Sequence, residues 1–316
     1  MSASENEVSE KMPSVALQRF SWGVLGYFIA TILWGTVVRA TGSGAGCGEH
    51  WPLCNGTVMQ TAPSVQTMIE FAHRITSGLD GVLILVLLVW TFRGTGKGHL
   101  ARWVAAASVF FTITEGALGA LLVKLGYTAQ SHAPMRAPFL ALHLANTLML
   151  VAVIAMTAHM LGRTAGYKWR ELRLTAPVGT TVGMLAVMVV GITGSMAALG
   201  DTLFPPSSLA EGIKQDFSGD SEWLLRWRWT HPTVAIVASI FLIWLLIRAA
   251  RRGGPWDNRA LSGFVVALLA LQYVLGALDV WLLAPVWMQV AHLLGADVTW
   301  SALVVLTARL TLLPRE

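Results

Sequence analysis

Long apolar runs constrain the fold of this chain more than any other feature. Each run is long enough to cross a bilayer, because a spanning helix needs about 20 mostly apolar residues. The eight runs cover about 19–40, 68–92, 101–124, 138–162, 174–198, 229–250, 260–283 and 288–309. Only 12% of the 316 residues are charged, whereas a soluble domain carries about 25%. The runs are continuous and do not alternate as barrel strands would, so the sequence predicts an all-α integral membrane protein with eight transmembrane helices.

The distribution of lysine and arginine predicts the orientation in the membrane. Most of the 22 basic residues lie in the N-terminal tail, at the C-terminal end, and after the second, fourth and sixth runs. Loops rich in these residues stay on the cytoplasmic side. We therefore expect both termini in the cytoplasm, 1–18 as a cytoplasmic tail and a bacterial inner membrane as the location. Membrane lipid is an expected partner, and nucleic acid is not.

The segments that follow the first and fifth runs are long and are expected on the outer side. The second of them, 200–228, contains Pro205-Pro206 and ends in a stretch rich in tryptophan. Trp223, Trp227 and Trp229 resemble the aromatic belt that membrane proteins place at the bilayer surface. We interpret these side chains as an interfacial anchor.

The two halves of the chain share short patterns in the same order. Val-Val-x-x-Thr-Gly-Ser occurs at 37–43 and at 189–195, and Leu-Gly-Ala-Leu occurs at 118–121 and at 275–278. Repeated matches at similar spacing indicate a duplication. Since each half has four helices, both halves enter the membrane from the same side, and the repeats are parallel. The prediction is two pseudo-symmetric four-helix bundles, 19–165 and 172–310.

Four histidines lie near the outer ends of the even-numbered runs: His73, His143, His231 and His292. Each half therefore offers two imidazoles at similar depth. Haem iron accepts axial imidazoles, and helical bundles hold cofactors between facing helices. A single membrane histidine is often a hydrogen-bonded helix contact instead. Four at equivalent positions favour two haem sites, with these histidines as iron ligands.

Glu70 and Arg74 flank His73, whereas Trp227-Arg228-Trp229-Thr230 precede His231. A carboxylate near the ligand in one half only suggests that the N-terminal half does chemistry and the C-terminal half holds a permanent cofactor. Two alternatives remain. Glu70 and Arg74 are spaced for a helix-stabilising pair. Glu70-x-x-His73 also matches a di-iron motif, but carboxylate di-iron bundles use that motif twice, and here it occurs once.

Cys47 and Cys54, with His50 between them, lie in the first outer segment. The outer side is oxidising, so a disulfide is permitted there. The pair is either a structural staple or a redox-active disulfide, since exposed disulfides tend to be labile.

Residues 37–56 (VVRATGSGAGCGEHWPLCNG) and 70–74 (EFAHR), with the four histidines, resemble the haem A synthase family. The resemblance implies oxidation of the C8 methyl group of haem O to a formyl group by successive hydroxylations, for cytochrome oxidase biogenesis. It implies haem b on His231 and His292, and the substrate haem on His73 and His143. Glu70, His73 and His143 would then be catalytic, and Arg74 would bind the substrate haem.

The same resemblance implies several partners. They are haem O synthase, cytochrome oxidase assembly factors, and a quinol or another electron donor. Family members often have His-Arg where this chain has His231-Pro232. Two other functions fit the histidine pattern: a dihaem cytochrome b that transfers electrons from quinol, and a parallel-repeat transporter with histidine proton relays.

Overall fold

The computed structural model describes residues 12–57, 61–129, 131–162, 172–174, 178–251 and 258–314, with the backbone alone described for 172–174 and 313–314. Within these ranges, eight helical segments are long and apolar enough to cross a membrane. They are α1 (Val15–Ala40), α2 (Val65–Gly94), α3 (Leu100–Lys124), α4 (Arg136–Leu161), α5 (Val178–Leu203), α7 with α8 (Trp223–Arg226 and Thr230–Arg251), α9 (Arg259–Trp281) and α10 (Val286–Thr311). The remaining elements are η1 (Ser43–Ala45), α6 (Leu209–Phe217) and the paired strands β1 (Leu172–Leu174) and β2 (Leu312–Pro314). The prediction of an all-α, multi-pass membrane protein is confirmed.

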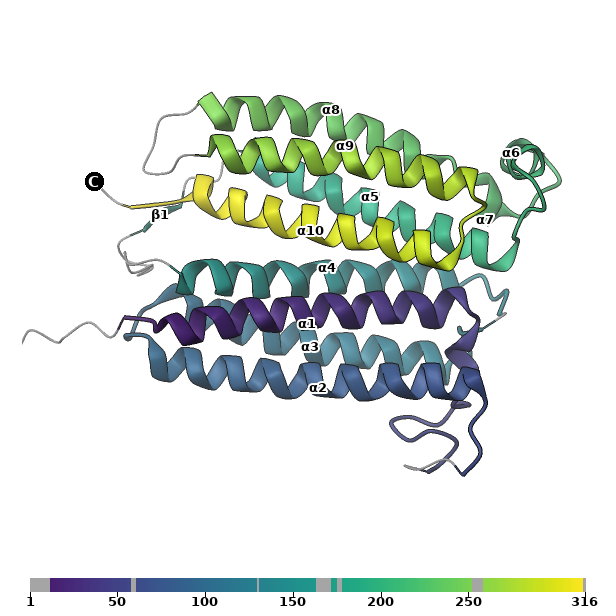
Figure 1. Ribbon diagram of the computed structural model, residues 1–316, viewed down its shortest axis with the longest axis horizontal. Helices are drawn as coiled ribbons and strands as arrows, with labels where there is room; N and C mark the ends of the chain where they lie inside the picture. The colour runs from purple at the N-terminus through teal and green to yellow at the C-terminus, as the bar shows by residue number, and fades with distance from the viewer. Residues whose placement is uncertain are drawn as a thin grey trace, which may run out of the picture.

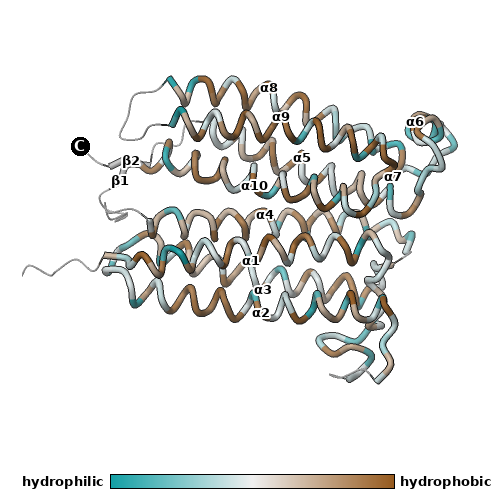
Figure 2. The backbone as a smooth tube through the Cα atoms, in the orientation of Figure 1, coloured by the Kyte–Doolittle hydropathy of each residue, from teal (hydrophilic) through white to brown (hydrophobic). Residues whose placement is uncertain are grey.

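Local sequence explains where the helices begin. The hydroxyl groups of Ser14 and Ser64 accept hydrogen bonds from the backbone N–H groups of Leu17 and Thr67. These serines satisfy donors that the first helical turn leaves unpaired. Figure 2 shows hydrophobic residues along most of the length of the long helices, which is the surface that lipid requires.

The long helices form two groups that lie side by side in Figure 1. Helices α1 to α4 pack together in one group, and α5, α8, α9 and α10 pack in the other. At the contact between the groups, the buried Trp300 indole on α10 donates to the Leu148 carbonyl on α4 at 2.7 Å. Near the other end, the Arg39 guanidinium donates to the Ala198 carbonyl on α5 at 2.7 Å and to Gln289 on α10 at 2.6 Å.

The start of α1 and the end of α10 lie at the same end of the molecule (Figure 1). This arrangement agrees with eight crossings. Which end faces the cytoplasm stays a prediction, as does the internal repeat. The first 11 residues of the predicted tail and the predicted boundary at 165 lie outside the described residues.

The predicted boundaries of the fifth helix and of the segment after it were wrong. The sequence predicts a helix at about 174–198, whereas α5 runs from Val178 to Leu203 and is followed by α6 and α7. Gly200 did not end the helix. A Cβ there would lie 3.2 Å from the Arg228 side chain, so glycine makes room for that arginine. The helix stops before Pro205-Pro206, since proline cannot continue an α-helix.

Arg228 explains why the segment after α5 is ordered. Its guanidinium binds Asp201 on α5 at 2.9 Å and Asp216 on α6 at 2.7 Å. Arg228 is itself buried one turn before His231. The ion pairs therefore fix α6 over the end of the C-terminal bundle that carries this histidine.

Candidate functional site

His231 on α8 and His292 on α10 face each other. Their ring centroids are 6.4 Å apart, and the ring planes are nearly perpendicular, at 82°. A metal-bound imidazole nitrogen lies about 2 Å from its metal, so two rings on opposite sides of one ion have centroids on the order of 6 Å apart. The spacing of this pair therefore fits one haem iron between the two rings.

Nδ1 of His231, the ring nitrogen that would not bind the metal, has partners on α5. Nδ1 lies 3.1 Å from the Val190 carbonyl oxygen and 3.4 Å from the Thr193 hydroxyl, both on α5. A ligating histidine commonly donates one N–H to such an acceptor, which leaves the other nitrogen for the metal. Val190 and Thr193 thus orient the His231 ring with Nε2 available.

Glycines on neighbouring helices make space for three of the four rings. A Cβ added to Gly194 would lie 3.0 Å from Cε1 of His231, and one added to Gly276 would lie 3.3 Å from Cε1 of His292. In the other half, a Cβ on Gly35 would lie 3.1 Å from Cε1 of His73. These contacts are closer than most Cβ atoms tolerate, so the ring positions depend on the glycines.

We expect Gly194→Val to weaken haem retention in the C-terminal half by about 10- to 100-fold, the range that disturbing a ligand-orienting residue typically costs. The valine methyl groups would displace His231, whose Cε1 would lie 3.0 Å from the new Cβ. Haem content per purified protein measures the effect. Gly263→Val on α9 is the control, because a Cβ at Gly263 meets nothing within 4 Å. Equal haem content in both variants would show that Gly194 does not position the ligand.

In the N-terminal half, His73 on α2 lies against α1, and its buried Nδ1 has no hydrogen-bond partner among the described atoms. His143 on α4 faces α3, where Glu115 Oε1 lies 3.4 Å from its Nδ1. Glu115 was not predicted as a site residue from the sequence. An ionisable residue in the middle of an apolar run was the available signal, because such residues are costly in a membrane and are usually functional.

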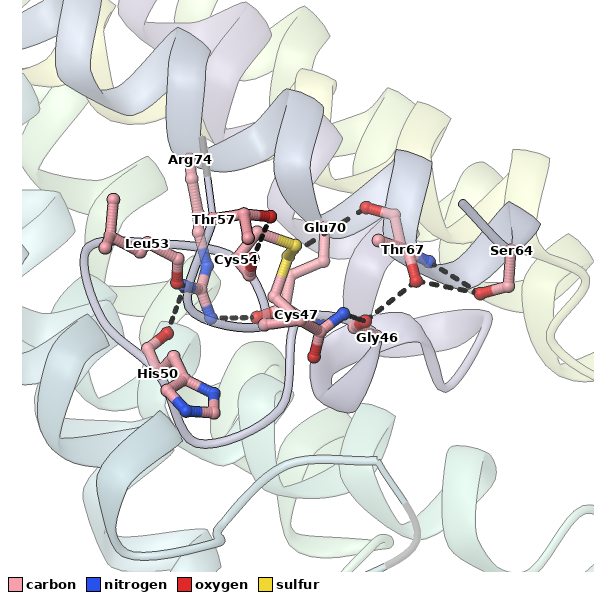
Figure 3. Close-up of a disulfide and its surroundings, with 11 residues drawn as sticks. Gly46, Cys47, His50, Leu53, Cys54, Thr57, Ser64, Thr67, Glu70 and Arg74 are labelled. Atoms are coloured by element: carbon pink, nitrogen blue, oxygen red, sulfur yellow. Dashed lines mark hydrogen bonds and ion pairs between the residues drawn. A yellow bond between two sulfur atoms is a disulfide. The ribbon is translucent and has the colours of Figure 1, made fainter. Parts of the chain in front are cut away.

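Glu70 faces the disulfide loop, as Figure 3 shows. Its Oε2 accepts the Cys47 backbone N–H at 2.7 Å, and its Oε1 accepts from the Arg74 guanidinium at 2.6 Å. The side chain is almost completely buried, at 4% exposed. The alternative role of Glu70, an ion pair with Arg74 on the same helix, is therefore present, and the same carboxylate also holds the loop.

Arg74 and the two cysteines complete this arrangement. The predicted disulfide between Cys47 and Cys54 is confirmed, and both residues are buried. The Arg74 guanidinium donates to the carbonyl oxygens of His50 and Leu53 within the loop (Figure 3). His50 thus contributes its backbone carbonyl to the anchoring of the loop. The predicted contact of Arg74 with a substrate haem stays a prediction.

The fold and the site together define an integral membrane protein whose described residues form eight long apolar helices, with two half-buried imidazoles facing each other within one helical bundle. The chain belongs to the COX15-CtaA family, described as "Cytochrome oxidase assembly protein", whose family model matches residues 18–304.

Curated relatives agree with this membership. A protein named "Protoheme IX farnesyltransferase" from Thermus thermophilus is 41% identical over 293 residues, which cover 92% of this chain and 48% of the relative. The chain thus spans about half the length of that relative. A "Heme A synthase" from Bacillus licheniformis is 27% identical over 76% of this chain and 77% of its own length. Another, from Alkalihalophilus pseudofirmus, is 41% identical over 41% of each chain.

Proposed function

We propose that this protein is a haem A synthase, an oxidoreductase that converts the C8 methyl group of haem O to a formyl group. Two successive hydroxylations of the methyl carbon give a geminal diol, which loses water to leave the aldehyde. The observation that carries the proposal is the facing pair His231 and His292, at 6.4 Å, in a chain of this family. The names of the Bacillus and Alkalihalophilus relatives support the reaction.

The two halves would bind different haems. His231 and His292 in 172–310 would hold haem b, which supplies redox chemistry when bound. His73 and His143 in 19–165 would hold the substrate haem, with Arg74 near its edge and Glu70 required for the oxidation. The buried carboxylate of Glu70, fixed by two hydrogen-bond donors, supports a catalytic role. The Cys47 backbone N–H donates to the same carboxylate and both cysteines are buried, which supports a structural role for the disulfide. A redox role, which was argued from exposure, stays a prediction.

The proposed reaction also implies a cellular location and a set of partners. We place the protein in a bacterial inner membrane with both termini cytoplasmic. Haem O synthase, oxidase assembly factors and a quinol or other electron donor are the expected partners. The family description supports a place in cytochrome oxidase assembly.

Two other functions have specific support. The histidine pairs in both halves also suit a dihaem cytochrome b that only transfers electrons. The name of the Thermus relative points to farnesyl transfer onto protohaem, although only 48% of that relative is matched.

Identification of the haems separates these functions. The full chain is expressed in cells with and without a haem O source, and the extracted haems are identified by mass spectrometry. We expect haem A only in cells that contain both this protein and the haem O source. Bound haem with haem O left unchanged would favour the cytochrome, and farnesylated haem formed from protohaem would favour the transferase. A purified protein without haem would exclude the haem A synthase and the dihaem cytochrome b, and would favour a transporter.

A further inference from the structure

The two halves present different side chains to equivalent histidines. Glu115 on α3 lies 3.4 Å from Nδ1 of His143. On α9, the side-chain amide nitrogen of Gln272 donates to Nδ1 of His292 at 3.3 Å and to the His292 carbonyl oxygen at 3.1 Å. Glu115 and Gln272 each come three residues before the matched Leu-Gly-Ala-Leu sequence. A carboxylate in one half therefore takes the place of an amide in the other.

The Glu115 carboxylate is held in one orientation by its neighbours on α4. The Asn146 amide donates to Oε2 at 2.6 Å, and the Thr147 hydroxyl donates to Oε1 at 2.5 Å. Asn146 is fixed in turn, since its amide also donates to the Phe111 carbonyl and its oxygen accepts from Thr114. This network keeps Oε1 3.4 Å from Nδ1 of His143, which is an ion-pair distance without the alignment of a hydrogen bond.

Carboxylate and amide have different effects on a ligating histidine. A carboxylate only accepts hydrogen bonds, whereas an amide offers an uncharged oxygen or an N–H group. When a ligating histidine donates its second N–H to a carboxylate, its tautomer and ring orientation are fixed and it becomes a more basic ligand. A more basic ligand stabilises the oxidised iron and lowers the reduction potential, one of the ways in which a protein tunes haem.

We propose that Glu115 is a positioning residue that holds His143 with its Nδ1–H toward the carboxylate, and so gives the N-terminal haem site a more strongly donating ligand than Gln272 allows in the C-terminal site. This inference rests on the proposed binding of the substrate haem by His73 and His143. It assigns the difference between the two sites to a single pair of side chains, separate from Glu70.

The test exchanges the two side chains in the full chain. Glu115→Gln, Glu115→Asp and Gln272→Glu are purified with haem b in the C-terminal site and titrated with haem O. Three properties are measured: the affinity for haem O, the midpoint potential of each haem by spectroelectrochemistry, and the electron paramagnetic resonance spectrum of each ferric haem. None of them depends on turnover.

Glu115→Gln is expected to weaken haem O binding by about 10- to 100-fold and to shift the N-terminal potential to more positive values. The midpoint potential of the C-terminal haem should not change. Glu115→Asp keeps a carboxylate, so its N-terminal potential should shift less than that of Glu115→Gln. The reciprocal Gln272→Glu should move the C-terminal potential to more negative values. If Glu115→Gln does not retain haem b, this reciprocal variant tests the same principle in the other half.

Two results would overturn the inference, and a third would overturn the proposed function. An unchanged N-terminal potential and resonance spectrum in Glu115→Gln would overturn the inference. Loss of haem A formation with both properties unchanged would also overturn it, and would indicate proton transfer by Glu115. If the wild-type chain binds no haem O at all, the proposed function fails before the inference is reached.

Discussion

Replacing His231 or His292 with alanine is expected to remove most of the bound haem b. The two rings face each other at 6.4 Å, so either change leaves iron with an imidazole on one side only. Disturbing a residue that only orients a ligand weakens binding by about 10- to 100-fold. Removing the ligand itself should weaken haem b binding by more than this. The reduced-minus-oxidised absorption spectrum of the purified protein measures the remaining haem b.

His132→Ala is the matched control for this prediction. The His132 ring packs against Phe204 outside the proposed pairs, with ring centroids 5.3 Å apart. This variant should keep its haem b. A haem b signal that survives in both His231→Ala and His292→Ala would show that the cofactor has been assigned to the wrong residues.

Glu70→Gln is expected to keep haem b and to lower haem A formation by about 10²- to 10⁴-fold, the usual contribution of a group that transfers a proton. Glutamine has nearly the same shape and can still accept the Cys47 N–H, but it removes the negative charge. Glu70→Ala should also stop product formation, with the added cost of leaving the Arg74 guanidinium without its carboxylate partner. Haem extraction from cells with a haem O source measures the product.

Thr67→Val separates chemistry from loop anchoring. The Thr67 hydroxyl, on the same helix, donates to the Gly46 carbonyl of the disulfide loop at 2.8 Å. The variant therefore loosens the loop but leaves the carboxylate in place. We expect it to retain haem A formation. If Thr67→Val and Glu70→Gln lose product to the same extent, Glu70 serves to hold the loop.

The sequence predicted most of the transmembrane architecture, because hydropathy is a local property. A run of about 20 apolar residues must become a spanning helix whatever its neighbours are. All eight predicted runs correspond to observed helices. The ends of the helices were predicted less well than the helices themselves. For example, α5 continues through Gly200 to Leu203, and the Arg228 side chain packs against that glycine.

The histidines and cysteines were also evident from the sequence, but their surroundings were not. Hydropathy and spacing identified His231 and His292, whereas their separation across one site comes from the packing of α8 and α10. Similarly, Glu70 was identified as an exceptional carboxylate, but its hydrogen bond from Cys47 depends on how the disulfide loop folds back onto α2.

By itself, then, the sequence determined which segments cross the membrane and which residue types are available for chemistry. Both follow from the cost of placing polar groups in lipid. Only the tertiary structure decided which polar groups meet. Glu115 reaches His143, and Gln272 reaches His292, because neighbouring helices pack with particular faces together. Helix packing depends on side chains far apart in the chain. The sequence places Glu115 and Gln272 at the same distance before a Leu-Gly-Ala-Leu pattern, but it could not show that each side chain reaches a histidine.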